Sequence, residues 1–141
     1  MTKYSYIFTL AAVFLLYSCG PSISDQNKEL RAKVIAVHDE VMPQMGKLKN
    51  LEKQALNLAE ELEANEEGDS LRVQELKALA YDLDQAHEGM FVWMRQYEQE
   101  DGERTPEEVT AYLNDQMTKV QKVNEDIKAS LSKASSLLED Q

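Results

Sequence analysis

Two short blocks of the chain carry the residue types that bind soft metal ions. Residues 38–45 (HDEVMPQM) and 87–94 (HEGMFVWM) each contain one histidine and two methionines, spaced three and four residues apart. At about 100° per residue, each trio falls within roughly 60° on one face of an α-helix. Thioether sulfur and imidazole nitrogen suit Cu(I), and Ag(I) is similarly soft. We call this set the His/Met layer; its members are His38, Met42, Met45, His87, Met90 and Met94.

The two blocks are expected to face one another. Residues 65–69 (NEEGD) form a helix-breaking cluster, so the flanking helices should be antiparallel neighbours. In such a hairpin, the numbers of two facing residues have a mean equal to the residue number at the centre of the turn. This mean is 66 for each of three cross-pairs: His38–Met94, Met42–Met90 and Met45–His87. A second turn near residue 103 adds Met117 and Tyr112 at this level, and Trp93 lies there too.

The His/Met layer has an ordinary structural interpretation. Pro43 lacks the N–H that would bond to the carbonyl of Asp39, so it is expected to kink its helix. Methionine is flexible enough to fill the uneven space beside a kink. Asp84, three residues before His87, could hold that ring by a hydrogen bond. On this interpretation the layer is only hydrophobic core.

Ligand binding is the alternative interpretation. The six residues of the layer could form a Cu(I) or Ag(I) site, or one His and one Met could ligate haem iron. Zinc fits less well: Asp39, Glu40 and Glu88 lie beside the histidines in the sequence, but consecutive helical residues point about 100° apart, so these carboxylates point elsewhere.

No residue is assigned a catalytic role, and we expect the protein not to be an enzyme. The sequence has no Gly-rich phosphate loop, no G-x-S-x-G motif and no paired carboxylates on an apolar stripe. Its one cysteine, Cys19, is expected to be lipidated, which leaves no free thiol for catalysis.

The elements that carry these residues are predicted to be three long helices. Apolar residues recur every three or four positions over segments of about 25–65, 70–100 and 106–139. The fold class is therefore all-α: an antiparallel, up-down-up three-helix bundle with coiled-coil-like packing over residues 25–139. Long amphipathic helices also pair readily, so self-association is an open possibility.

Residues near the helix ends agree with this division. Thr105, Pro106 and Glu108 predict a helix start, with threonine as N-cap, proline at the first helical position and glutamate closing a capping box. Gly68 and Gly102 suit left-handed positions just beyond a helix end.

The beginning of the chain is predicted to be a targeting signal and not part of the folded domain. Lys3 precedes an apolar run at 7–17, which is the length of a secretory signal. Residues 16–19 (LYSC) resemble a bacterial lipobox, which implies cleavage of residues 1–18 and lipidation of Cys19; an ordinary signal peptide is the alternative. Residues 19–24 would be a short tether. The resemblance to lipoproteins implies the outer membrane, because Gly20 rather than aspartate follows the cysteine, and the lack of an acidic cluster directly after it favours the periplasmic side.

The charge limits the kinds of partner. The net charge is −11, and loss of Lys3 with the signal peptide makes it −12. Such acidity argues against nucleic acid and anionic lipid surfaces as partners. The acidic residues at 98–103 are expected to face solvent or to form a rim for a basic partner.

The blocks HDEVMPQM and AHEGMFVWMRQY resemble two blocks of small Bacteroidota lipoproteins that are often labelled "viral A-type inclusion protein". The resemblance covers the lipobox and the first two helices, and the third helix matches only in pattern. It implies a lipid-anchored helical protein of the cell envelope, and it implies no activity. We therefore expect a non-enzymatic scaffold or protein-interaction module with an unknown protein partner, and Cu(I) or Ag(I) binding as the alternative.

Overall fold

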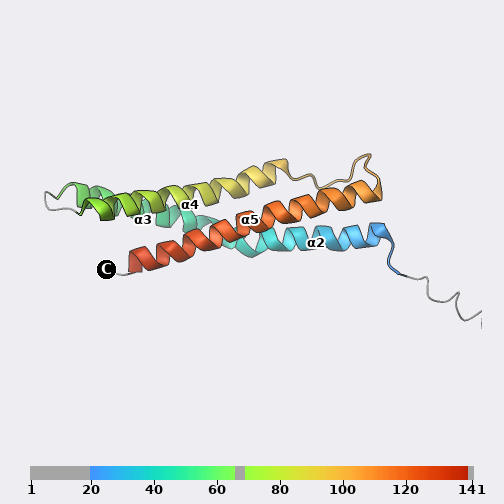
Figure 1. Ribbon diagram of the computed structural model, residues 1–141, viewed down its shortest axis with the longest axis horizontal. Helices are drawn as coiled ribbons and strands as arrows, with labels where there is room; N and C mark the ends of the chain where they lie inside the picture. Colours follow the sequence, from blue (N-terminus) through green and yellow to red (C-terminus); the bar gives the residue numbers. More distant parts are fainter. Residues whose placement is uncertain (1–19, 66–68, 140–141) are drawn as a thin grey trace, which may run out of the picture.

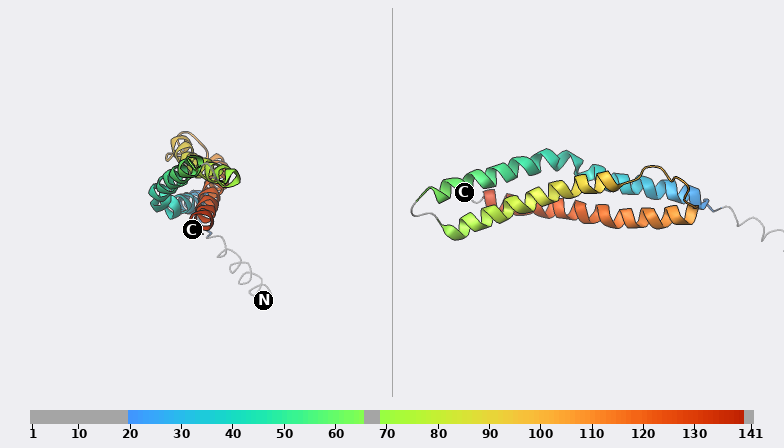
Figure 2. Two further views of the ribbon diagram at one scale, coloured as in Figure 1. Left: turned by 90° about the vertical axis from the view of Figure 1, so that its left-hand side faces the viewer. Right: turned by 90° about the horizontal axis from the view of Figure 1, so that it is seen from above.

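The computed structural model describes residues 20–65 and 69–139, which form an all-α bundle (Figure 1). Its helices run antiparallel, as expected: α2 and α3 run away from the first described residues, α4 returns, and α5 runs outward again (Figures 1 and 2). The elements are α2 (Ile23–Val41), the short 3-10 helix η2 (Met42–Gln44), α3 (Met45–Glu63), α4 (Ser70–Gln96) and α5 (Pro106–Glu139).

The first predicted helix is interrupted at Pro43. The N–H of Met42 still donates to the carbonyl of His38, but the N–H of Met45 donates to Met42, only three residues earlier. This tighter bonding is the 3-10 form, and it follows from the N–H that proline lacks. The two helices on either side of this interruption pack on different neighbours. Helix α2 packs mainly on α5, whereas α3 packs mainly on α4.

Side chains cap the N-termini of α4 and α5. The carboxylate of Asp69 accepts hydrogen bonds of 2.9 and 3.3 Å from backbone N–H groups in the first turn of α4. The predicted capping box before α5 is confirmed: Glu108 N–H donates to Thr105 Oγ1 at 3.3 Å, and Thr105 N–H donates to Glu108 Oε2 at 2.7 Å.

Helix α4 ends at Gln96, so the predicted end near residue 100 is wrong. Tyr97 is extended (φ −76°, ψ 123°), and the N–H of Glu98 leaves the helix to donate to the hydroxyl of Tyr112 at 2.6 Å. Gly102 has φ +61°, the left-handed conformation expected for it, but it lies inside the loop rather than directly after the helix. Gly68 lies outside the described residues.

The core follows the predicted apolar stripes and adds residues beside them. Leu79, Ala86 and Trp93 of α4 are buried. Among the described residues, four polar side chains are also buried: Asn27, Gln116, Asn124 and Ser130. The apolar residues that recur every three or four positions and are buried include Val34, Val41, Leu48, Ala55, Val73, Leu76, Leu83, Met90, Val109, Leu113, Val120, Ile127 and Ala134.

Buried asparagines join α2 to α5. Asn124 Nδ2 donates to the carbonyl of Val37 at 2.9 Å and to Glu40 Oε2 at 3.0 Å. At the other end of α2, Asn27 Nδ2 donates to the carbonyl of Pro106 at 2.7 Å. Because a buried amide must be hydrogen-bonded, these contacts favour one axial alignment of the two helices.

None of the helices in the described ranges is both long enough and apolar enough to cross a membrane.

Candidate functional site

The structure brings one histidine and one methionine of the His/Met layer into contact. Nε2 of His38 on α2 lies 3.2 Å from Sδ of Met94 on α4. The two residues are 56 positions apart in the chain, and the contact confirms the pairing inferred from the turn at residue 66.

The other four members do not share one environment. Met90 is fully buried and Met45 almost so, and both belong to the core. Met42 is partly buried and packs against that core. His87 is also partly buried, but its ring packs on Phe91 of its own helix, with ring centroids 4.9 Å apart.

The hydrogen bond expected for His87 is not formed. Asp84 instead accepts a 3.1 Å bond from Lys49 Nζ on α3. Lys49 also pairs with Glu52, and these two carboxylates raise its pKa, with Glu52 having the larger effect. The prediction that Asp84 holds the His87 ring is therefore wrong, because a cation across the helix pair binds this carboxylate.

Asp39 orients the imidazole of His38. Nδ1 of His38 lies 2.8 Å from Asp39 Oδ1, and the His38 side chain is 17 % exposed. A carboxylate is an acceptor only, so Nδ1 carries the hydrogen in this contact. In the neutral imidazole, the lone pair is then on Nε2, the nitrogen that faces the sulfur of Met94.

The ring of Trp93 lies beside the contact between His38 and Met94. Its ring centroid lies 5.5 Å from that of His38, and the residue is only 4 % exposed. The indole Nε1 is buried and has no hydrogen-bond partner among the described residues. Trp93 thus contributes its ring to this region and not its hydrogen-bond donor.

A row of aromatic rings leads from this pair to the α4–α5 loop. Trp93 stacks on Tyr97 with centroids 4.8 Å apart, and Tyr97 lies 6.3 Å from Tyr112 of α5. The guanidinium of Arg104 lies 4.6 Å from the centroid of the Tyr112 ring, close enough for a cation–π contact. The loop therefore packs on α5 through aromatic faces.

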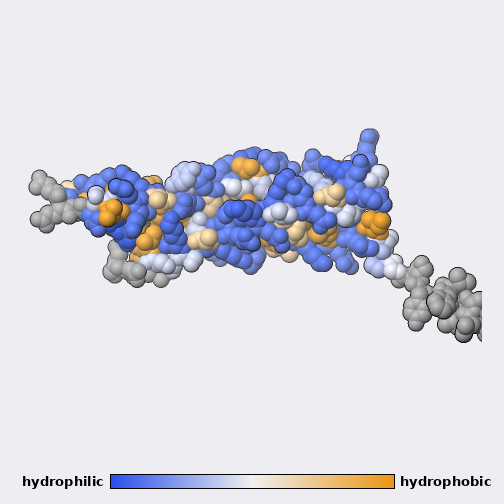
Figure 3. All heavy atoms as spheres, viewed as in Figure 1, coloured by the Kyte–Doolittle hydropathy of each residue, from blue (hydrophilic) through white to orange (hydrophobic). Residues whose placement is uncertain are grey.

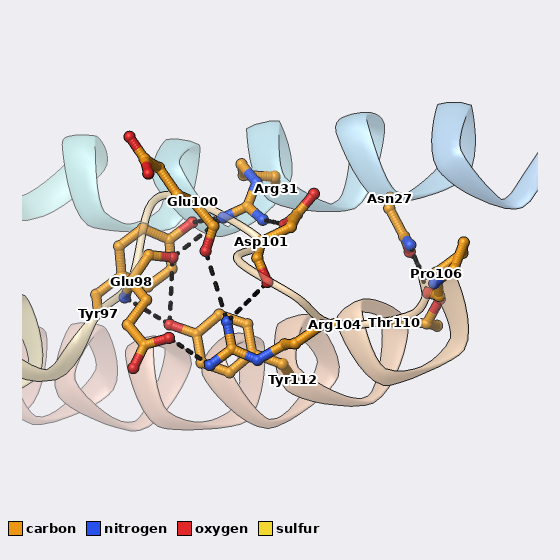
Figure 4. Close-up of polar contacts among 10 residues, drawn as sticks. All are labelled: Asn27, Arg31, Tyr97, Glu98, Glu100, Asp101, Arg104, Pro106, Thr110 and Tyr112. Atoms are coloured by element: carbon orange, nitrogen blue, oxygen red, sulfur yellow. Dashed lines mark hydrogen bonds and ion pairs between the residues drawn. The ribbon is translucent and has the colours of Figure 1, made fainter.

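Two arginines hold the loop, as Figure 4 shows. Arg31 of α2 donates to the carbonyl of Glu98 at 3.2 Å and forms an ion pair with Asp101. Arg104 forms an ion pair with Glu98, whose carboxylate raises the pKa of Arg104 above its usual value. Residues 98 and 101 are exposed, as expected, but their carboxylates bind arginines of the same chain.

A hollow lies elsewhere, between α4 and α5. It has a volume of 460 Å³, and its lining includes Asp82, Ser130 and Lys133. Lys133 Nζ donates to Asp82 Oδ2 at 2.6 Å, and Ser130 donates to the carbonyl of Asp82 at 3.3 Å. These groups are already paired with one another, so the groove has fewer free polar groups to offer a ligand.

Within the described ranges, no group of three or more His, Cys, Asp or Glu side chains is arranged to hold a metal ion. Methionine is not among those residue types, so binding of Cu(I) or Ag(I) by the His/Met layer stays a prediction. Cys19 and residues 1–18 lie outside the described residues, so the signal peptide and lipidation also stay predictions.

The chain matches no protein-family model, and it has no significant match among curated proteins or solved structures.

Proposed function

We propose that this protein is a non-enzymatic, lipid-anchored lipoprotein of the cell envelope that acts as a helical scaffold or protein-interaction module. The observation that carries the proposal is the position of the two ends of the bundle. The described chain begins at one end, and the end of α3 and the start of α4 lie at the opposite end (Figure 1). An anchor at Cys19 would thus hold the α3–α4 connection away from the membrane.

The length of α5 gives the reach of such a module. Its 34 residues span about 50 Å at 1.5 Å per residue. Buried Asn27 and Asn124 fix α5 against α2, so the bundle would act as a stiff spacer and not as a flexible linker.

The outer surface supports contacts with protein. The face seen in Figure 3 is largely hydrophilic with separate apolar spots. Three of the exposed apolar side chains belong to α3 or to the first half of α4, away from the predicted anchor: Leu56, Leu71 and Tyr81, which are 40 %, 69 % and 64 % exposed. A partner that covered these side chains would remove apolar surface from water, so these positions are the ones at which contact with a protein is tested.

The proposed location of the protein in the cell rests on the sequence. The lipobox at residues 16–19 and the resemblance to Bacteroidota lipoproteins support attachment through Cys19. Gly20 supports the outer membrane, with the bundle in the periplasm.

The anchor is tested by metabolic labelling with an alkyne fatty acid. The wild-type chain should incorporate the label and sediment with membranes, whereas Cys19→Ala should do neither. Labelling of Cys19→Ala at the wild-type level would refute attachment at this residue.

The interaction role is tested by photocrosslinking in the cell. A benzophenone side chain at Leu71 or Tyr81 should give a discrete adduct of reproducible mass, whereas one at half-exposed Lys119 of α5 should not. Equal adduct patterns at all three positions would indicate random collision and count against the proposal.

A further inference from the structure

We propose that His38, Met94 and Met42, beside the ring of Trp93, form a binding site for a soft monovalent cation, Cu(I) or its analogue Ag(I). This inference does not depend on the anchoring or scaffold role. It also narrows the six-residue prediction, because it leaves out His87, Met45 and Met90.

The first step is the direction of the two donor atoms. Asp39 binds Nδ1 of His38, so the neutral ring presents the lone pair of Nε2 to Sδ of Met94. A carboxylate that holds the second nitrogen is the usual way in which proteins orient a histidine ligand. Two lone pairs that face each other are stabilised when a soft cation accepts both.

The second step is the spacing. Metal bonds to nitrogen and sulfur are about 2.0–2.3 Å long, so two ligand atoms of one ion can lie up to about 4.3 Å apart. The separation of 3.2 Å between Nε2 of His38 and Sδ of Met94 is shorter than this, so an ion can enter between them only if a side chain turns aside. The side chain of Met94 has three rotatable bonds, so its sulfur can move by about 1 Å while both helices stay in place.

The third step is the source of a further sulfur. Met42 lies one helical turn after His38, and its N–H donates to the carbonyl of His38. Residues four apart on a helix are neighbours on its surface. The partly buried side chain of Met42 has three rotatable bonds, so its sulfur can turn toward an ion at His38.

The fourth step is access and surroundings. The His38 side chain is 17 % exposed, so an ion can reach it from solvent without unfolding of the bundle. An ion at Nε2 would lie near the indole of Trp93, whose π-electrons attract a cation within about 6 Å of the ring. Trp93 is the only tryptophan in the chain, so its fluorescence reports on this site alone.

The two histidines allow a matched comparison. His38 and His87 are both partly buried and both lie in the predicted layer, but in the described structure only His38 has a ring nitrogen within hydrogen-bonding distance of a thioether sulfur. His87→Gln therefore controls for loss of a histidine as such. Met94→Leu keeps the volume of the side chain and removes the sulfur, so it should fold even if His38→Gln does not.

The experiment is a titration of the full chain with Ag(I) in detergent micelles, with Cys19→Ser to remove the competing thiol. One equivalent of Ag(I) should change Trp93 fluorescence and shift the methyl NMR signal of Met94. His38→Gln and Met94→Leu should each weaken binding by at least about tenfold, while His87→Gln should keep the affinity within about twofold.

Two results would overturn the proposal. One is unchanged fluorescence and methyl signals at stoichiometric Ag(I), which would mean that His38 and Met94 are ordinary packing partners. The other is an equal loss of affinity in His87→Gln, which would place the site elsewhere. Competition by Cu(I) under reducing conditions, at a similar stoichiometry, would extend the result to copper.

Discussion

Nε2 of His38 and Sδ of Met94 lie 3.2 Å apart although they belong to different helices and to opposite sides of the α3–α4 connection. The contact lies one turn before the break at Pro43, where the chain passes from packing on α5 to packing on α4. The 3-10 break thus lies close to the point where an imidazole of α2 meets a thioether of α4.

Shortening a side chain should lower the free energy of unfolding more when that side chain is buried than when it is exposed. Leu83 of α4 is fully buried, and Leu83→Ala should lower the free energy of unfolding by about 2–5 kcal/mol, because it removes packing and leaves a cavity. Leu71→Ala on the same helix, where the side chain is 69 % exposed, should change it by less than about 0.5 kcal/mol. Urea denaturation followed by circular dichroism measures both. Equal effects would contradict the position of the core.

The buried amide of Asn124 should stabilise the α2–α5 pairing. Asn124→Ala removes the donor to Val37 and Glu40, so the free energy of unfolding should fall by about 1–3 kcal/mol. Asn114→Ala is the control, because Asn114 is exposed on the same helix. The same urea denaturation measures the two variants. Alanine favours a helix more than asparagine does, so Asn114→Ala should not destabilise the fold, and a loss of similar size there would show that the buried contact is not responsible.

Glu40 should make stability depend on pH in the acid range. Its hydrogen bonds from Lys128 and Asn124 hold its pKa below the ordinary value of 4.5. A group whose pKa is lowered on folding stabilises the fold above its unfolded pKa, and this contribution disappears as the pH falls through the folded pKa.

Glu40→Gln tests this dependence. The urea midpoint of wild type should exceed that of Glu40→Gln at about pH 7, and the difference should shrink toward about pH 3. Asp25, whose pKa the Ser22 hydroxyl lowers, is present in both proteins and cancels in the comparison. A difference that stayed constant from neutral to acid pH would mean that ionised Glu40 contributes nothing.

The hydroxyl of Tyr112 should hold the start of the α4–α5 loop. Tyr112→Phe keeps the ring beneath Arg104 but removes the acceptor for the N–H of Glu98. Loss of such a bond is worth about 0.5–1.5 kcal/mol, so hydrogen exchange at the Glu98 amide should speed up by about two- to tenfold. NMR exchange measurements test this. Tyr81→Phe, at an exposed hydroxyl on α4, should leave that rate unchanged.

Local chemistry explains what could be predicted about the fold. The capping box at Thr105 and Glu108 depends on four consecutive residues, and the 3-10 segment depends on the N–H that Pro43 lacks. The contact between His38 and Met94 follows from a turn centre and a helical repeat, both of which can be counted along the chain.

Other features could not be predicted because they depend on rotation of the helices about their axes. Helix α2 and the loop after α4 bring Arg31 to Asp101, although nothing in the acidic run 98–103 indicates which of its carboxylates meets an arginine. Asp84 is closer in sequence to His87, yet it binds Lys49.

The sequence by itself determined the three-helix division, the starts of α4 and α5, and the level at which His38 and Met94 meet, because caps, apolar periodicity and turn position act over short stretches of chain. Only the tertiary structure decided that His87, which was expected to face Met45, packs on Phe91 of its own helix. The reason is that a few tens of degrees of helix rotation direct a side chain toward a neighbouring helix or along its own surface, and all three packed helices set that rotation together.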